Sequence, residues 1–300
     1  MRQLVILSGK GGTGKTTVAS AFIRLSGALA CADCDVDAPN LHLVNGLYSS
    51  HKSTPYFGLP LADINPTRCV SCGECHWSCR FDAIIPGEPY RVNPYSCEGC
   101  GVCTLVCPTD AIRMRPHQAG SMTLFFNDDV VFSTAKLKMG SGTSGLLVSQ
   151  VKKRMKEASR GDVPFAIIDG SPGIGCPVIA TLSGADVTLI VAEPSLSGIS
   201  DLESIVKTAR GFGVKIAVCV NKADINPFKT EEIRQYCDRE DLFFAGVIPY
   251  DPLAIEAVNR GVSIADFPCP SGRATEAIYR GILPMLEVEQ PAAIEVPDKV

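Results

Sequence analysis

The stretch LSGKGGTGKTT, residues 7–17, constrains the fold of this chain more than any other segment. Residues 9–16 match the pattern G-x-x-x-x-G-K-[ST], with an apolar run before them and apolar residues at helical spacing after them. Such a loop between strand and helix binds phosphate, because its glycines let backbone N–H groups point inward and the helix N-terminus is electropositive. We therefore expect a nucleotide site in which Lys15 offsets β- and γ-phosphate charge and Thr16 offers its hydroxyl to Mg²⁺.

The other apolar runs predict an α/β sheet. Strand-like runs end near residues 32, 168, 192, 220 and 248, and helical patterns separate them. Strands that are apolar throughout are typical of a parallel sheet covered on both faces, so we expect a doubly wound, mostly parallel fold. Ligands of such sheets bind at the carboxyl ends of the strands. The runs SMTLFF and VVFSTA bracket Asn127, Asp128 and Asp129, which predicts a β-hairpin.

One segment breaks this alternation. It is rich in Cys, Pro and Gly and has little helix or strand pattern, with α/β sequence on both sides. We therefore expect the first part of the nucleotide-binding domain at 1–60, a small inserted α+β module at 61–116, and the rest of the nucleotide-binding domain at 117–300.

The inserted segment contains the spacing C-x2-C-x2-C-x3-C twice. This run is typical of two-cluster bacterial ferredoxins, in which the fourth cysteine ligates the other [4Fe–4S] cluster. The repeat of FDAI at 81–84 as TDAI at 109–112 supports an internal duplication. The two runs differ in the residue that follows them, which is Arg80 after the first run and Pro108 after the second. Zinc fits less well, because zinc sites do not need two triplets with an exchanged fourth ligand. The expected first cysteine set is Cys69, Cys72, Cys75 and Cys107, and the second is Cys97, Cys100, Cys103 and Cys79.

Lys10 is a second lysine in the phosphate loop, and the nucleotide of its own chain does not require it. With it the loop reads K-G-G-x-G-K-[ST], which resembles the deviant Walker A ATPases of the MinD/ParA/Mrp and nitrogenase iron protein superfamily. The whole chain resembles the members that contain an inserted ferredoxin domain. The resemblance implies an ATP-dependent homodimer in which Lys10 reaches the phosphates on the other subunit and stabilises charge as an arginine finger does.

The resemblance also assigns residues outside the loop. Asp35 would orient or activate the attacking water, Asp33 and Asp169 would lie with Thr16 at Mg²⁺, and Asn221 would contact the base. The stretch NKAD at 221–224 also matches a guanine-specificity motif, whereas the rest of the family pattern favours ATP. The roles of Asp37 and Cys176 stay open, with packing favoured for Cys176. The catalytic residues are thus Lys10, Lys15 and Asp35, and the nucleotide-binding residues are Gly9, Lys10, Gly11, Gly12, Thr13, Gly14, Lys15, Thr16, Thr17, Asn221, Pro249 and Tyr250.

Net charge and hydropathy limit the cellular location and the classes of partner that we expect for this chain. The net charge of −4 disfavours a general nucleic-acid binder, which needs a basic surface. We expect a cytoplasmic protein, because the sequence has no bilayer-spanning run, no signal peptide at its start, and an acidic segment rather than a basic amphipathic anchor from 292 to 300. One basic cluster, Lys152, Lys153, Arg154 and Lys156, is expected to form a solvated helix face.

Two functions fit these patterns. In the first, ATP binding and hydrolysis in a dimer gate electron transfer between the two [4Fe–4S] clusters and a partner protein. In the second, the ATPase serves Fe–S or metal-cofactor assembly or intracellular positioning, and the clusters are structural or sensory.

Overall fold

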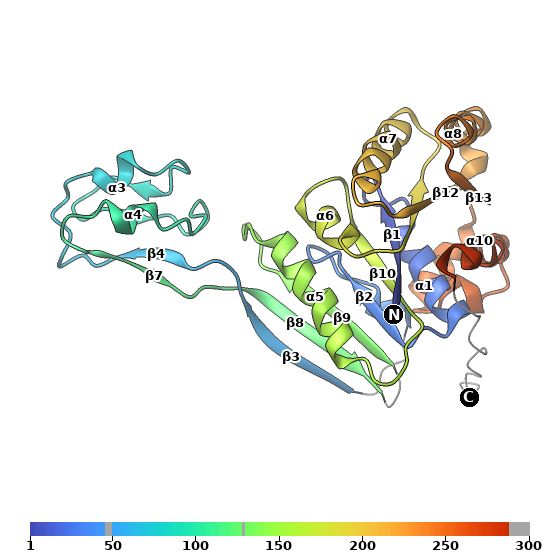
Figure 1. The fold of residues 1–300 in the computed structure, drawn as a ribbon, viewed down its shortest axis with the longest axis horizontal. Coiled ribbons are helices and arrows are strands. Elements are labelled where there is room, and N and C mark those ends of the chain that lie inside the picture. The colour runs from blue at the N-terminus through green and yellow to red at the C-terminus, as the bar shows by residue number, and fades with distance from the viewer. Residues whose placement is uncertain (46–49, 128–129, 288–300) are drawn as a thin grey trace.

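The central sheet has nine strands in a computed structural model that describes residues 1–45, 50–127 and 130–287. The strands are β1 (Arg2–Ser8), β2 (Ala30–Asp33), β3 (Ser50–Phe57), β8 (Gln118–Phe126), β9 (Val131–Leu137), β10 (Phe165–Pro172), β11 (Val187–Ala192), β12 (Lys215–Asn221) and β13 (Phe243–Ile248). Their order is β13-β12-β11-β1-β10-β2-β9-β8-β3 (Figure 1). Neighbours from β13 to β9 are parallel, whereas β8 and β3 pair antiparallel. The prediction of a mostly parallel sheet is confirmed.

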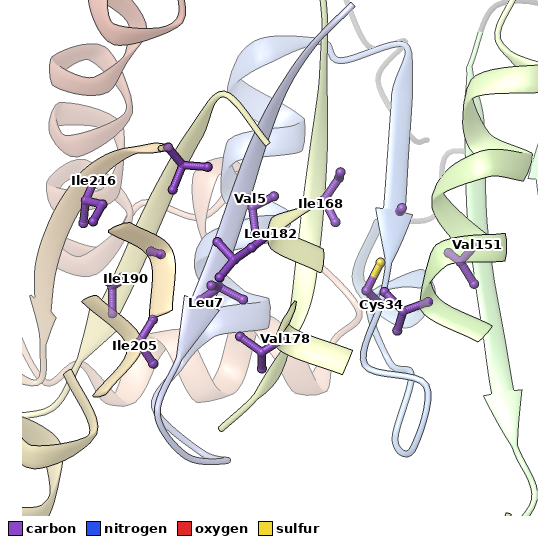
Figure 2. Packing of buried hydrophobic residues seen from close by; sticks show 14 of the residues in the cluster. Val5, Leu7, Cys34, Val151, Ile168, Val178, Leu182, Ile190, Ile205 and Ile216 are labelled. Atoms are coloured by element: carbon purple, nitrogen blue, oxygen red, sulfur yellow. The ribbon is translucent and has the colours of Figure 1, made fainter. Parts of the chain in front are cut away.

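Helices cover both faces of this sheet. They are α1 (Lys15–Ser26), α2 (His42–Asn45), α5 (Ser144–Ala158), α6 (Cys176–Leu182), α7 (Leu196–Arg210), α8 (Pro227–Arg239), α9 (Pro252–Asn259) and α10 (Pro270–Leu286), with 3-10 turns η1 (Ala223–Ile225) and η2 (Ile264–Asp266). Side chains alternate along β1, so Val5 and Leu7 belong to one cluster with residues of α5, α6 and α7 (Figure 2). Residues of α8 belong to the same cluster. Leu4 and Ile6 pack on the other face with α1 and α10. The doubly wound arrangement follows from strands that are apolar on both faces.

The antiparallel edge of the sheet was only partly predicted. The expected hairpin is confirmed as β8 and β9, although Asp128 and Asp129 lie outside the described residues. Strand β3 was not predicted, because it is mostly polar and contains Pro55. As an edge strand that pairs with β8 alone, β3 tolerates a residue that cannot donate a backbone hydrogen bond.

The β3–β8 ribbon leads into a separate small unit (Figure 1). This unit contains β4 (Leu61–Ile64), α3 (Glu74–Trp77), β5 (Ile84–Ile85), β6 (Arg91–Val92), α4 (Val102–Leu105) and β7 (Ile112–Arg115), with β4 pairing β7 and β5 pairing β6. Its buried residues form their own cluster: Ala62, Cys75, Ile84, Cys103 and Ile112. The cysteine-rich segment therefore folds around a core distinct from that of the sheet.

None of the helices in the described part of the chain is long and apolar enough to cross a membrane. The segment from 292 to 300, expected from its sequence not to act as an anchor, lies outside the described residues.

The expectation of a solvated basic face on α5 is wrong for two of its residues. Lys152 is 6% exposed, and its Nζ donates to the carbonyl oxygens of Thr181 at 2.5 Å and Ser183 at 2.6 Å. These carbonyls lie at the C-terminus of α6, where unpaired backbone acceptors attract a cation. Arg154 donates to Thr54 Oγ1 at 2.8 Å. The sequence pattern does not predict this, because α5 lies against α6 on one side and against the β3–β8 edge on the other.

Burial lowers the pKa of Lys152 to about 8, so its charged form is less stable in the folded protein than in the unfolded chain. A lowered lysine pKa means that the unfolded state binds more protons above pH 8, so stability rises with pH there. The quantity to compare is the unfolding free energy of the wild type minus that of Lys152→Met. We expect this difference to rise by about 2 kcal/mol between pH 7 and pH 9.5. Urea unfolding at both pH values measures this difference.

Lys153→Met is the matched control, because the Lys153 side chain is 74% exposed on the same helix. Its difference from wild type should not change with pH. An equal pH response of the two variants would contradict the burial of a charged Lys152.

Candidate functional site

The phosphate loop joins the end of β1 to the start of α1. Its backbone takes the left-handed conformation at Gly12 (φ 81°) and Gly14 (φ 89°), which glycine adopts without strain. Helix α1 then begins at Lys15, and its first backbone bond runs from Val18 N to Gly14 O at 3.0 Å. The loop therefore presents the N-terminus of a twelve-residue helix at the carboxyl edge of the sheet.

A buried ion pair lies at the centre of this edge. Lys15 is 5% exposed, and its Nζ contacts Oδ1 of the fully buried Asp169. Burial alone would lower the pKa of Lys15, but Asp169, with further help from Asp33, raises it above its ordinary value. The lysine is therefore held as a cation against the end of β10.

Asp33 lies beside Asp169 because the two residues are register partners in β2 and β10. Its carboxylate accepts hydrogen bonds from the backbone N–H groups of Asp35, Asn40 and Leu41 at 3.0 to 3.1 Å. Burial and the neighbouring Asp169 raise the pKa of Asp33 to about 7. Asp33 thus fixes the loop after β2 while adding a second carboxyl group next to Lys15.

Asp35 is half-buried in the same loop. Burial raises its pKa, and Lys15 is the largest influence in the opposite direction. Asp37, whose role the sequence left open, is exposed two residues further on. The structure thus places Asp35 within electrostatic reach of Lys15 and Asp169, while Asp37 is exposed.

The donor set at this point has the chemistry of a divalent-cation site. Asp169 Oδ2 is buried and has no hydrogen-bond partner among the described residues. Carboxylate and hydroxyl oxygens are the ligands that Mg²⁺ prefers, and Asp33 and Thr16 lie on the adjoining segments. The described residues hold no group of three or more His, Cys, Asp or Glu that could bind a metal ion on their own. Mg²⁺ is usually bound through one or two carboxylates together with substrate phosphates.

Lys10 does not face its own Lys15–Asp169 pair. Its Nζ lies 3.0 Å from Glu193 Oε2 and 3.4 Å from Ser197 Oγ, and the side chain is 39% exposed. Glu193 follows β11 directly and also pairs with Lys222 at 2.7 Å. Glu193 was not predicted from the sequence, although its position at the carboxyl end of a buried strand was the available signal.

A cavity of about 340 Å³ adjoins the phosphate loop. The three residues expected at the base, Asn221, Pro249 and Tyr250, all line it together with Gly12 and Gly14. Asn221 Nδ2 donates to Thr13 O at 2.7 Å, which ties the end of β12 to the loop. A second cavity, of about 460 Å³, shares Thr17 with this one and extends along Thr16 and Asn40.

The eight module cysteines lie around two small cavities. One cavity is lined by Cys69, Cys72, Cys75 and Cys107, and the other by Cys79, Cys97, Cys100 and Cys103. Each cavity therefore takes three cysteines from one run and one from the other. Backbone N–H of Ala111 also donates to Cys107 Sγ at 3.3 Å.

The two cysteine runs share an unusual backbone. Positive φ angles occur at two equivalent places in each run, Ser71 and Gly99 and then Gly73 and Gly101, and at a third place three residues after each run, Asp82 and Asp110. A four-residue helix follows the second position in both. The sequence repeat is thus also a structural repeat, and two of the six positions bear aspartate rather than glycine at a φ near 48°.

The module meets the nucleotide-binding domain at the loop 138–143. A cavity of about 330 Å³ is lined by Cys97 and Glu98 on one side and by residues of this loop on the other. A β-carbon at Gly142 would lie 2.9 Å from Glu98 Oε2. The same loop leads into α5, where a β-carbon at Gly145 would lie 3.1 Å from the β-carbon of Cys176.

Cys176 begins α6, directly after the segment 170–175 that follows Asp169. Packing was the favoured expectation for it, but the residue is exposed. The other cysteines outside the module are buried: Cys31, Cys34, Cys219, Cys237 and Cys269.

Comparison with known proteins identifies the nucleotide-binding part. A family model described as the CobQ/CobB/MinD/ParA nucleotide binding domain matches residues 4–264. The uncharacterized protein MJ0578 of Methanocaldococcus jannaschii is 34% identical over 236 residues, which cover 76% of this chain and 82% of that protein.

Two further proteins are less similar to this chain in sequence. An iron-sulfur cluster carrier protein of Pyrococcus furiosus is 23% identical over 280 residues, which cover 87% of this chain and 78% of that protein. The solved structure of the septum site-determining protein MinD of Pyrococcus horikoshii, complexed with Mg-ADP, superposes with a TM-score of 0.56 at 18% identity. That alignment covers 94% of this chain and 95% of the other, and it shows a shared fold.

The Lys15–Asp169 pair predicts an asymmetric response to mutation. Lys15→Met leaves two buried carboxyl groups without their cation and should lower the unfolding free energy of the nucleotide-free protein by about 3 kcal/mol. Asp169→Asn should cost less, because Asp33 still faces Lys15. Urea unfolding without nucleotide measures both, and the double variant should cost less than the sum of the two single variants. Strictly additive effects would show that the two side chains do not interact in solution.

Proposed function

The chain belongs to the CobQ/CobB/MinD/ParA family of nucleotide-binding proteins and is a P-loop ATPase of the MinD/ParA type, and from this premise we propose that it is an ATP-gated iron-sulfur protein. In this proposal the chain binds two [4Fe–4S] clusters in its inserted module and forms a homodimer when ATP is bound. The ATPase cycle then controls electron transfer between these clusters and a partner protein in the cytoplasm.

The observation that carries this proposal is the exchange of one cysteine between the two runs. Four thiols around each of two cavities match the ligand number of two [4Fe–4S] clusters. A single zinc ion would instead draw four thiolates to about 2.3 Å from one point. The exchange of one cysteine between the two runs is typical of two-cluster ferredoxins and has no counterpart in the usual zinc sites. When bound, such clusters supply one-electron transfer.

The chain's own residues suit ATP hydrolysis. In this proposal the loop N–H groups and Lys15 hold the phosphates, and Thr16, Asp33 and Asp169 would hold Mg²⁺, which neutralises phosphate charge. Water attacks the γ-phosphorus as the bond to ADP breaks, and Asp35 orients that water and accepts its proton. The raised pKa of Asp35 favours this role, because a more basic carboxylate takes up a proton more readily.

Adenine is the base that this site favours. In the guanine-specificity motif the aspartate of NKxD must be free to accept hydrogen bonds from the base. Here Asp224 Oδ1 accepts a hydrogen bond from the backbone N–H of Tyr250 at 2.6 Å, so part of its acceptor capacity is used within the protein. Asp224 therefore shapes the loop at Pro249 and Tyr250 beside the base cavity.

A continuous set of contacts supports coupling between the two parts. Glu98, in the second cysteine run, lies against loop 138–143, and the first turn of α5 lies against Cys176 at the start of α6. Segment 170–175 joins that helix to Asp169. Movement of this segment when the γ-phosphate leaves would therefore reach the second cysteine set through α6 and α5.

A second candidate is a role in assembling Fe–S or other metal cofactors. It is favoured by the similarity to a protein named as an iron-sulfur cluster carrier. Transfer of an intact cluster from this protein to an apo-acceptor, dependent on ATP, would select that function over electron transfer.

Nucleotide should change the redox properties of the module. We expect MgATP to shift the midpoint potential of at least one cluster by about 60 mV, a tenfold change in a one-electron equilibrium. Lys15→Met should lose the shift, because the phosphates of ATP are then no longer held beside Asp169 and segment 170–175. An anaerobic redox titration followed by EPR measures the midpoint potentials of the wild type and the variant. If MgATP does not change the potentials of the wild type, the gating proposal is wrong.

The exchanged ligands predict an unusual pattern of iron loss. Cys79 and Cys100 belong to one set, so the double variant Cys79→Ala/Cys100→Ala should keep about four irons per chain. Cys72→Ala/Cys79→Ala removes one ligand from each set and should lose nearly all iron. Iron analysis of anaerobically purified protein measures this, with Cys176→Ala as the control at full iron. The reverse order of the two double variants would mean that each run ligates its own cluster.

A further inference from the structure

Glu193 joins two lysines at the edge of the nucleotide site. Its carboxylate lies 3.0 Å from Lys10 Nζ and 2.7 Å from Lys222 Nζ, and its side chain is 17% exposed. Burial alone would raise the pKa of Glu193, but the hydrogen bonds from Lys222 and Lys10 lower it below its ordinary value. Glu193 is therefore a carboxylate at neutral pH that faces two ammonium groups.

The two lysines are not held equally. Lys222 takes a left-handed backbone (φ 55°) and also donates to Gly12 O at 3.0 Å, so it is fixed to the phosphate loop independently of Glu193. Lys10 has Glu193 and a longer 3.4 Å contact with Ser197, and it remains 39% exposed. Glu193 is thus the main charged partner of Lys10 in the single chain, and Lys10 is the more accessible of the two lysines.

The contact between Lys10 and Glu193 limits how Lys10 can act in a second subunit. To reach a phosphate elsewhere, the ammonium group must leave Glu193, and the carboxylate keeps Lys222 as its counter-ion. The triphosphate of ATP carries more negative charge than one carboxylate, so it can compete for Lys10 where a weaker anion would not. Loss of the γ-phosphate reduces that competition and favours return of Lys10 to Glu193.

We infer that Glu193 is a positioning residue that retains Lys10 on its own subunit until the ATP phosphates of a second copy of the chain displace it. The inference rests on the proposed dimer and adds to it the group from which Lys10 must be released. It makes Glu193 a determinant of the protein concentration at which ATP drives dimer formation.

Glu193→Gln tests the inference, because it removes the charge and keeps the shape of the side chain. Sedimentation velocity with a non-hydrolysable ATP analogue and Mg²⁺ gives the concentration for half-maximal dimer. We expect Glu193→Gln to lower it roughly 5- to 20-fold, since each dimer breaks two partly exposed ion pairs. Glu193→Asp should lie between the two. Glu240→Gln, which removes a surface carboxylate paired with Arg210, is the matched control and should behave as wild type.

Lys222→Met separates this role from a merely structural one. If Glu193 acts by retaining Lys10, then Lys222→Met should not lower the concentration for half-maximal dimer, because Glu193 still holds Lys10. If Glu193 only fastens the loop through Lys222, then Lys222→Met should reproduce the effect of Glu193→Gln, and the inference is wrong.

The sedimentation experiment gives one result if the proposed dimer is wrong and another if only the role of Glu193 is wrong. A wild type that does not dimerise with the ATP analogue, or does so without need of Lys10, overturns the dimer and the inference together. A wild type that dimerises through Lys10, with Glu193→Gln unchanged from it, overturns the inference alone.

Discussion

The buried pair of Lys15 and Asp169 is the interaction on which the nucleotide site depends. It joins the start of α1 to the end of β10, and the register partner of Asp169 is Asp33 at the end of β2. Three chain segments that are distant in sequence therefore meet around one cation. Burying a charge is unfavourable unless it is paired, so the carboxyl edge of the sheet holds these segments in one arrangement before any nucleotide enters.

The inserted module depends on a different constraint. Its apolar cluster contains five buried residues, two of which are cysteines of the two sets, and Ala83 and Ala111 are buried beside it in sequence. A core of this size stabilises a fold of about 55 residues poorly, and small domains usually gain the remainder from disulfides or a bound metal. The repeated positive φ angles bring the first three cysteines of each run around one cavity, and the fourth is supplied by the other half. Neither half of the repeat completes its set alone.

Sequence reasoning succeeded where local pattern decides the structure. The buried strands and the helices between them follow from apolar periodicity, and the phosphate loop follows from its glycines. Where long-range packing decides, it failed: β3 forms because β8 lies beside it, and Lys152 is buried because α5 packs on α6. Glu193 was missed for the same reason. Its partners Lys10 and Lys222 lie at the ends of neighbouring strands, and only the order β12-β11-β1 places the three together.

Helix α5 is the element that the module and the nucleotide site have in common. Its N-terminal loop lies against the second cysteine run, its first turn lies against Cys176, and Lys152 is bound to the far end of α6. Because α6 is held by α5 at both ends, the two helices resist independent movement. The β3–β8 ribbon also connects the module to the sheet, but it joins at the edge strand, far in strand order from β1 and the phosphate loop. A signal from the γ-phosphate therefore has its shorter physical route through segment 170–175, α6 and α5.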